Sequence, residues 1–236
     1  MKSTELMFYV VRHGQTVFNV TENVQGFSDS PLTQEGLEQS KRVGKNMKDI
    51  KFISAWSGDA KRQQITIKNI MADNHVAHTY SIPELREWNF GGFETGKNAY
   101  MWEKILKKQG IKLGADENVH ESFRKWIMAV GDRAFADGIY DADETKKAEK
   151  YDDILLRVKT AMDKITTTSL GICKEQNIST GNVLVVSSGC FIRTILLASV
   201  PDERFGRDIF NCSVSILRYF DGKFSLKTAN DLSFLR

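Results

Sequence analysis

The apolar run from Met7 to Val11 does most to limit what this chain can fold into. Its residues are rich in β-branched and aromatic side chains, which is typical of a buried strand. Arg12, His13 and Gly14 follow the run directly. Open α/β sheets bind ligands at the carboxyl ends of their strands, so these three residues are expected to face a crevice. Arginine offers donors suited to phosphate and histidine can act as nucleophile or base, although so short a motif also fits a surface pair at a strand end.

Alternating strand-like and helix-like patterns along the chain predict an α/β fold with a mostly parallel central sheet. The expected strands share short apolar or alternating runs, and they cover 7–11, 52–56, 77–80, 182–187, 213–220 and 224–228. The last two flank Asp221-Gly222, a strong signal for a hairpin turn. The expected helices share apolar stripes at helical spacing; one begins after the N-cap Thr33, and the others cover 60–71, 100–108, 121–135, 151–174 and 189–200. Residues 17–32 are expected to form an irregular loop.

Composition and charge narrow the function classes. A length of 236 residues, with 41% hydrophobic and 27% charged residues, is ordinary for a globular chain with one full core. The net charge of +3, without a long basic run, gives no case for a nucleic-acid partner. Cys173, Cys190 and Cys212 are odd in number and lack Cys-x-x-Cys spacing, which argues against a disulfide framework or a zinc site. No apolar run is long enough for a signal peptide or a membrane span, so a cytoplasmic location is expected.

Four ordered blocks in the first hundred residues carry a resemblance to a known family. They are Arg12-His13-Gly14-Gln15-Thr16 with Asn19; Val24-Gln25-Gly26 with Asp29-Ser30-Pro31-Leu32-Thr33 and Gly36; Ser57-Gly58-Asp59-Ala60-Lys61-Arg62 with Thr66; and Leu85-Arg86-Glu87 with Phe90-Gly91 and Glu94. In this order the blocks resemble those of the histidine phosphatase family, which includes cofactor-dependent phosphoglycerate mutase. The resemblance runs along nearly the whole chain. It implies one three-layer α/β/α domain over 1–236, with a C-terminal hairpin and a helical lid insertion at about 95–150.

The resemblance also implies a role for each member of a catalytic group. His13 would attack phosphorus and become a phosphohistidine, while Arg12 and Arg62 would hold the phosphoryl oxygens. Glu87 would protonate the leaving oxygen and then act as a base toward water, which requires a carboxyl pKa raised by partial burial. Arg62 falls in the first turn of an expected helix, whose N-terminus would add to the binding of phosphate.

Further residues are expected to bind the substrate. Asn19, Gln25 and Gly26 resemble the family's loop that hydrogen-bonds the phosphoryl group or the substrate. The expected partner is a small phosphorylated molecule. No metal or cofactor is expected, because side chains neutralise the family's pocket and the sequence offers no cluster with ligand spacing.

The fifth block departs from the family pattern. Where the family has Val-Ser-His-Gly, this chain has Val186-Ser187-Ser188-Gly189, so Ser188 stands in place of the second pocket histidine. Ser188 and Gly189 are still expected to contact phosphate. Losing a preorganised donor typically costs roughly 10²–10³-fold in rate, of which a serine hydroxyl recovers part. Restoring histidine at position 188 is therefore expected to raise activity if the neighbouring side chains leave room for the ring.

Three functions compete at this point. The leading hypothesis is a metal-independent phosphomonoester hydrolase that acts through His13. The second is a catalytically impaired relative that binds a phosphorylated ligand or a partner, motivated by Ser188. The third is a mutase of the phosphoglycerate type, ranked last because the insertion contains no proline. Trp102, Phe123 and Trp126 in the insertion are expected to belong to the core and not to line a pocket.

Overall fold

A single mixed sheet forms the centre of the computed structural model, which describes residues 4–74, 76–114, 117–201 and 205–236. Its strands lie in the order β3-β2-β4-β1-β5-β6. Their bounds are Glu5–Arg12 (β1), Phe52–Ser57 (β2), Thr79–Ser81 (β3), Thr180–Ser187 (β4), Val214–Phe220 (β5) and Lys223–Asp231 (β6). The first four are parallel to one another, whereas β5 runs antiparallel to β1 and to its other neighbour, β6. The expected sheet, mostly parallel with a C-terminal hairpin, is confirmed.

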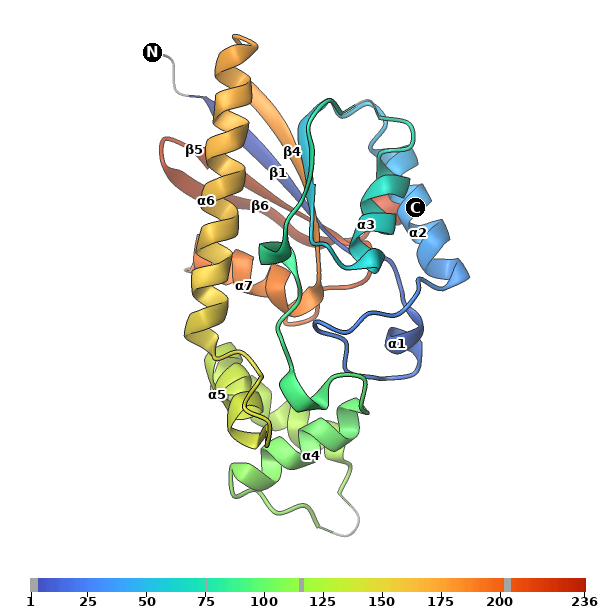
Figure 1. The fold of residues 1–236 in the computed structure, drawn as a ribbon, viewed down its shortest axis with the longest axis vertical. Helices are drawn as coiled ribbons and strands as arrows, with labels where there is room; N and C mark the ends of the chain where they lie inside the picture. The colour runs from blue at the N-terminus through green and yellow to red at the C-terminus, as the bar shows by residue number, and fades with distance from the viewer. Residues whose placement is uncertain (1–3, 75, 115–116, 202–204) are drawn as a thin grey trace.

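Helices cover both faces of this sheet (Figure 1). The α-helices of the described residues are Val17–Val20 (α1), Gln34–Asn46 (α2), Lys61–Ile70 (α3), Asn98–Lys108 (α4), Val119–Ala142 (α5), Tyr151–Glu175 (α6) and Gly189–Ser199 (α7). Successive residues of β1 and β4 belong to two separate cores: Val10 and Val185 to the one under α6 and α7, Val11 and Val186 to the one under α2 and α3. A strand buried on both faces is apolar at every position, which explains the continuous apolar runs in the sequence.

Local sequence signals set the ends of several elements. Thr33 caps α2 by accepting the N–H of Gly36 at 3.0 Å. Asp221 and Gly222 both have positive φ, at 49° and 77°, as the tight turn between β5 and β6 requires. Residues 17–32 are less irregular than expected, because Thr16 caps the one-turn helix α1.

The segment Asn98–Ala142, which contains α4 and α5, lies beyond the carboxyl ends of β1 and β4 (Figure 1). We call it the α4–α5 segment. The helix expected over 121–135 is longer, at 119–142, and is broken at Gly131. There φ is 79° and ψ is −174°, a conformation that essentially only glycine adopts. The two halves of α5 therefore point in different directions.

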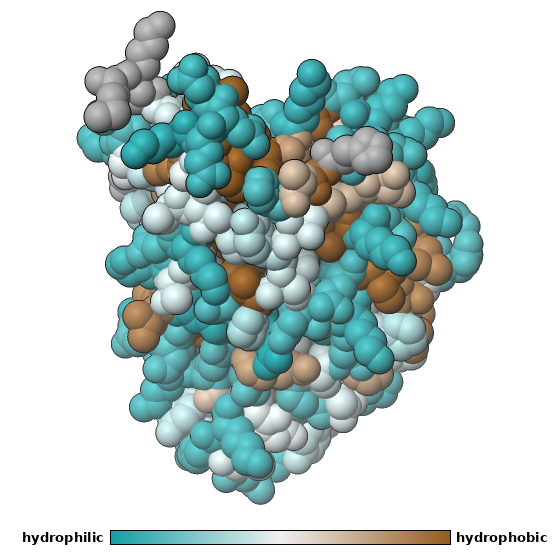
Figure 2. All heavy atoms as spheres, turned by 45° about the horizontal axis from the view of Figure 1, so that its top comes forward, coloured by the Kyte–Doolittle hydropathy of each residue, from teal (hydrophilic) through white to brown (hydrophobic). Residues whose placement is uncertain are grey.

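No helix in the described part of the chain combines the length and the apolar character needed to cross a bilayer. On the face shown in Figure 2, hydrophilic side chains surround smaller apolar areas.

Candidate active site

The carboxyl ends of β1 and β4 bring the first and fifth sequence blocks together. Arg12, the last residue of β1, is in register with Ser187, the last residue of β4. The backbone N–H of His13 donates to Ser187 O at 3.0 Å. Because these parallel strands end side by side, His13 lies next to the start of α7 although the two segments are distant in sequence.

His13 is a buried, neutral imidazole. Its side chain is only 2% exposed, and its Nδ1 lies 2.8 Å from Gly14 O. A carbonyl oxygen only accepts, so we assign the ring proton to Nδ1 and the free lone pair to Nε2. Burial lowers the pKa of His13 well below its ordinary value, and the charges of Arg62 and Arg12 lower it further. The ring therefore presents an unprotonated Nε2 at neutral pH.

Arg12 places part of its guanidinium beside the start of α7. Its Nη1 donates to Ile209 O at 2.6 Å, whereas its buried Nε has no hydrogen-bond partner among the described residues. A Cβ at Gly189 would lie 3.4 Å from that Nε, so a side chain there would crowd the guanidinium. Buried charged donors are rarely left unpaired, and this N–H marks a position suited to an anion.

Arg62 on α3 is held in place by residues 26–29, in the loop that precedes α2. Its Nη1 donates to Ser28 O at 2.8 Å and to Asp29 Oδ1 at 3.0 Å, and its Nη2 donates to Gly26 O at 2.7 Å. Its Nε is buried and, within the described chain, unpaired. At the N-terminus of α3, Asp29 Oδ2 accepts the N–H of Lys61 at 2.6 Å, so this one donor is not free for phosphate.

The carboxylate of Glu87 is held by hydrogen bonds from the N-terminus of α7. Its Oε1 accepts the N–H groups of Trp88 at 2.9 Å and Phe191 at 2.8 Å, and its Oε2 accepts that of Cys190 at 3.0 Å. Burial is the largest influence and raises the pKa of Glu87, although these hydrogen bonds and Arg62 act to lower it. The group is thus a buried acid held in one orientation.

Ser188 does not face an open pocket. It is fully buried, and Gln63 Nε2 donates to its Oγ at 2.9 Å and to Leu85 O at 3.1 Å. Gln63 follows Arg62 directly on α3, and sequence reasoning missed it. The only feature of the sequence that could have pointed to Gln63 is its position directly after Arg62, a residue of the third sequence block. The serine hydroxyl accepts from the amide, which leaves its own proton to be donated elsewhere.

The three expected substrate-binding loop residues fall into different environments. Asn19 Oδ1 accepts the N–H of Thr16 at 3.1 Å and the amide of Asn211 at 3.2 Å, so it holds the loop that follows His13. Gln25 Oε1 accepts from Ser30, while its Nε2 is buried and has no partner in the described part of the chain. Gln25 therefore offers a free donor, whereas the side-chain oxygen of Asn19 is already in use.

Gly26 helps to hold the side chain of Arg62 in place through its backbone carbonyl. Its N–H donates to Glu94 Oε2 at 3.0 Å, and its carbonyl accepts from Arg62. Glu94 also accepts the N–H groups of Phe27 and Ser28, which ties the whole turn down. A Cβ at Gly26 would lie 2.1 Å from a backbone oxygen, so only glycine fits. With both backbone groups engaged, Gly26 contributes by holding Arg62.

Arg157 on α6 is a second residue that sequence reasoning missed. Its guanidinium donates to Arg86 O at 2.7 Å and to Glu87 O at 2.9 Å, and it pairs with Glu149 at 2.7 Å. It also lies over the Phe191 ring, 4.4 Å from the centroid. Arg157 thereby fixes the backbone of the Glu87 loop. No signal marked it, since one arginine on a long amphipathic helix is unremarkable.

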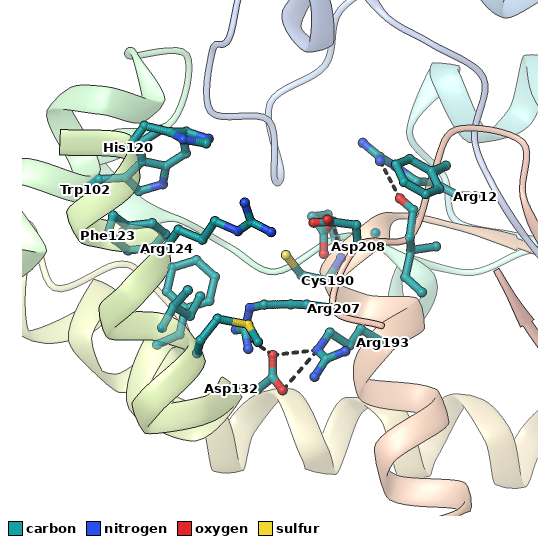
Figure 3. Close-up of a pocket in the computed structure, with 17 residues that line it drawn as sticks. Arg12, Trp102, His120, Phe123, Arg124, Asp132, Cys190, Arg193, Arg207 and Asp208 are labelled. Carbon is teal, nitrogen blue, oxygen red and sulfur yellow. Dashed lines mark hydrogen bonds and ion pairs between the residues drawn. The ribbon is translucent and has the colours of Figure 1, made fainter. Parts of the chain in front are cut away.

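A cavity of about 700 Å³ connects this group of residues to the α4–α5 segment. Figure 3 shows Arg12 and Cys190 on one side of the cavity and Trp102, His120, Phe123 and Arg124 on the other; Glu87 and Gly189 also line it. His13, Arg62 and Ser188 are not lining residues, and each is at most 2% exposed. As expected, Phe123 belongs to the core and Trp102 and Trp126 pack against it, but Trp102 and Phe123 also line the cavity. Trp126 does not line it.

Metal-binding side chains do not gather in the described residues: no three or more His, Cys, Asp or Glu lie close enough together to hold an ion.

Comparison with known proteins agrees with this geometry. The model of the histidine phosphatase superfamily (branch 1) matches residues 8–136 and 132–232. The chain belongs to the histidine phosphatase superfamily. The chain is 28% identical over 228 residues to phosphoglycerate mutase-like protein 4 from Arabidopsis thaliana, a match that covers 96% of this chain and 85% of that protein.

Solved structures share the fold of this superfamily member. A phosphoglycerate mutase from Bacillus anthracis superposes with a TM-score of 0.86 at 30% identity, over 99% of this chain and 96% of the other. Bacillus stearothermophilus YhfR superposes with a TM-score of 0.69 at 19% identity, over 98% of this chain and 100% of the other, which shows the fold alone.

Proposed function

We propose that this histidine phosphatase is a metal-independent phosphomonoester hydrolase that acts through a phosphohistidine on His13. One observation carries the proposal: a neutral imidazole with a free Nε2 lies close to two guanidinium groups, each with a buried Nε that has no partner in the described residues. The guanidinium groups of Arg12 and Arg62 suit the charge of a phosphoryl group, and Nε2 suits attack on phosphorus.

The first half-reaction transfers the phosphoryl group to the enzyme. His13 Nε2 forms a bond to phosphorus while the bond from phosphorus to the ester oxygen breaks, and Glu87 gives its proton to that oxygen. We place this proton on Oε2, because Oε1 already accepts two N–H groups and Oε2 only one. In the second half-reaction water attacks phosphorus, Glu87 takes a proton from the water, and the bond to Nε2 breaks.

Trapping the intermediate tests this proposal. Rapidly quenched enzyme should carry an acid-labile, base-stable phosphate on His13, seen by intact-mass analysis. His13→Ala is the control and should carry none. Turnover without an adduct would contradict covalent catalysis at His13, and an enzyme without any turnover would favour the impaired, ligand-binding alternative that Ser188 motivates.

The acid role of Glu87 has its own test. A good leaving group departs without a proton, so Glu87→Gln should lower kcat/KM much less for 4-nitrophenyl phosphate than for an alkyl phosphate. Equal losses on the two substrates would argue that Glu87 acts only by capping α7.

Phosphoryl transfer between positions of one substrate is a second candidate. It is supported by the names of the relatives, two of which are called phosphoglycerate mutase or mutase-like. Incubation with 3-phosphoglycerate separates the two functions, because a hydrolase releases inorganic phosphate and a mutase yields the isomeric phosphoglycerate.

We also propose a small phosphorylated molecule as the substrate and the cytoplasm as the location. Cys173, Cys190 and Cys212 are all free, and a reducing compartment keeps thiols in that state.

A further inference from the structure

The cavity in front of the candidate active site is larger than a phosphoryl group requires. Its volume of about 700 Å³ lies within the roughly 300–1,000 Å³ of pockets that hold drug-sized ligands. Resting on the proposed hydrolase function, we propose that the alcohol portion of the substrate carries a flat apolar ring system, which stacks against Trp102 and Phe123 of the α4–α5 segment.

The first support is the wall itself. Trp102 and Phe123 stack on each other with centroids 5.1 Å apart and an interplanar angle of 13°. His120 meets Trp102 edge-on at 5.1 Å, and Ile127 extends the apolar surface. Phe123 is buried and also packs against Trp126 and Phe135, so the half-buried Trp102 is the more accessible ring of the wall, and ring systems prefer to pack against such surfaces. The wall is therefore complementary to a flat group.

The second support is the rim of the cavity. Met128, on α5, is 67% exposed, and Phe210, after α7, is 50% exposed. Both line the cavity, and they come from different segments of the chain. Large apolar side chains left open to solvent at the mouth of a pocket favour an apolar occupant, and methionine adapts its shape to one.

The third support is the arrangement of charge. Asp132 pairs with Arg193 and with Arg207, each at 2.9 Å, so both guanidinium groups already share a carboxylate partner, although one positive charge is left over. Other polar groups of the lining, such as Arg12 and Glu87, belong to the phosphoryl end. Apart from Arg124 and Asp208, the charged groups of the lining are therefore either paired with one another or assigned to the phosphoryl end.

Arg124 supplies the competing interpretation. Figure 3 shows its side chain extending from α5 across the cavity, toward the wall that carries Cys190 and Asp208. Such a guanidinium suits either the phosphoryl group or a second anionic group on the alcohol. The experiment below includes a variant that distinguishes these uses.

The test compares two alkyl phosphates of similar intrinsic reactivity, 2-(1-naphthyl)ethyl phosphate and ethyl phosphate. The native enzyme should prefer the naphthyl compound in kcat/KM by at least tenfold. Trp102→Ala should reduce that preference roughly fivefold to tenfold through lost stacking. Trp126→Ala is the matched control, since this tryptophan is a neighbour outside the lining, and it should leave the preference unchanged. Met128→Ala, at an exposed position that tolerates truncation, should reduce the preference by a smaller factor.

The outcomes separate the two proposals. Hydrolysis without a naphthyl preference, or equal effects of Trp102→Ala and Trp126→Ala, would overturn the inference and leave the hydrolase proposal standing. A preference for 3-phosphoglycerate over both compounds, abolished by Arg124→Gln, would overturn it in favour of an anionic alcohol. If the protein turned over neither compound, calorimetry on His13→Ala would decide: tighter binding of the naphthyl compound supports the inference although the hydrolase proposal fails, and equal binding overturns it.

Discussion

We expect Ser188→His on its own to lower stability without improving activity, because Gln63 occupies the space that an imidazole needs. Ser188 Oγ lies 2.9 Å from Gln63 Nε2, and both side chains are fully buried. In the serine's rotamer, the next ring atom of a histidine extends one bond length further, which leaves roughly 1.5 Å where van der Waals contact needs about 3.5 Å. Overpacking of this kind typically costs about 1–3 kcal/mol.

The paired variant Gln63→Ala, Ser188→His removes this overlap. An imidazole at position 188 would then be able to donate to a phosphoryl oxygen in the transition state. The expected gain over the native enzyme is roughly tenfold to a hundredfold in kcat/KM, or about 1–3 kcal/mol. Gln63→Ala alone is the control. It leaves Ser188 Oγ without its N–H donor, whereas Leu85 O keeps the hydroxyl of Ser187 at 2.7 Å, and it should cost about 1–3 kcal/mol of stability.

The assay measures kcat/KM on 4-nitrophenyl phosphate and the thermal melt of all four proteins, so that the coupling between positions 63 and 188 follows from a double-mutant cycle. If Ser188→His alone reached the activity of the paired variant, Gln63 would not be filling the space in question. A well-folded paired variant with native or lower activity would refute a role for position 188 in stabilising the transferred phosphoryl group.

Three further predictions follow from the site and the α4–α5 segment. Arg62→Ala should weaken binding of inorganic phosphate by roughly tenfold to a hundredfold, measured by calorimetry, because a charge-assisted donor is lost; an unchanged Kd would mean that Arg62 is only structural. The pH profile of kcat/KM should have an acid limb well below pH 6.5, because burial lowers the pKa of His13 and activity is lost when His13 gains a proton. Its alkaline limb should lie above pH 4.5, because burial raises the pKa of Glu87 and activity is lost when Glu87 loses its proton. An alkaline limb that persists in Glu87→Gln would assign it to another group. Gly131→Ala should cost about 1–3 kcal/mol of stability through backbone strain alone, since nothing lies within 4 Å of the added Cβ; a thermal melt equal to the native one would refute the kinked backbone.

Much of the fold was predictable because the central strands are buried on both faces. Val10 and Val11 of the apolar run Met7–Val11 are fully buried in the two separate cores, as such a run predicts, and Asp221-Gly222 specifies its turn locally. Helix starts such as Thr33 were equally local. The break at Gly131 was not predictable, because a single glycine inside a helical pattern also occurs in unbroken helices.

The candidate site likewise has one part that the sequence predicts and one part that it does not. The placement of His13 at the end of β1 followed from the strand pattern. The contacts that decide how each group behaves did not, because they join residues that are distant in sequence. Asp29 accepts the N–H of Lys61 at the start of α3, and Gln63 donates to the hydroxyl of Ser188. Arg157 on α6 donates to the backbone oxygen of Glu87. Hydrogen bonds of this kind depend on the packing of whole elements, which no local pattern records.

The α4–α5 segment supplies the aromatic wall from one continuous stretch of chain, whereas the groups proposed to handle phosphate come from the sheet edge, α3, α7 and the loops tied by Glu94. Mutations can therefore alter the aromatic wall and the phosphate-handling groups independently. Substitutions within Asn98–Ala142 can alter which alcohol fits while the chemistry at phosphorus is retained, and a graft of this segment between relatives would transfer preference without rebuilding the reaction centre. On the proposed function, the reaction at phosphorus and the selectivity for the alcohol are therefore located in separate parts of the chain.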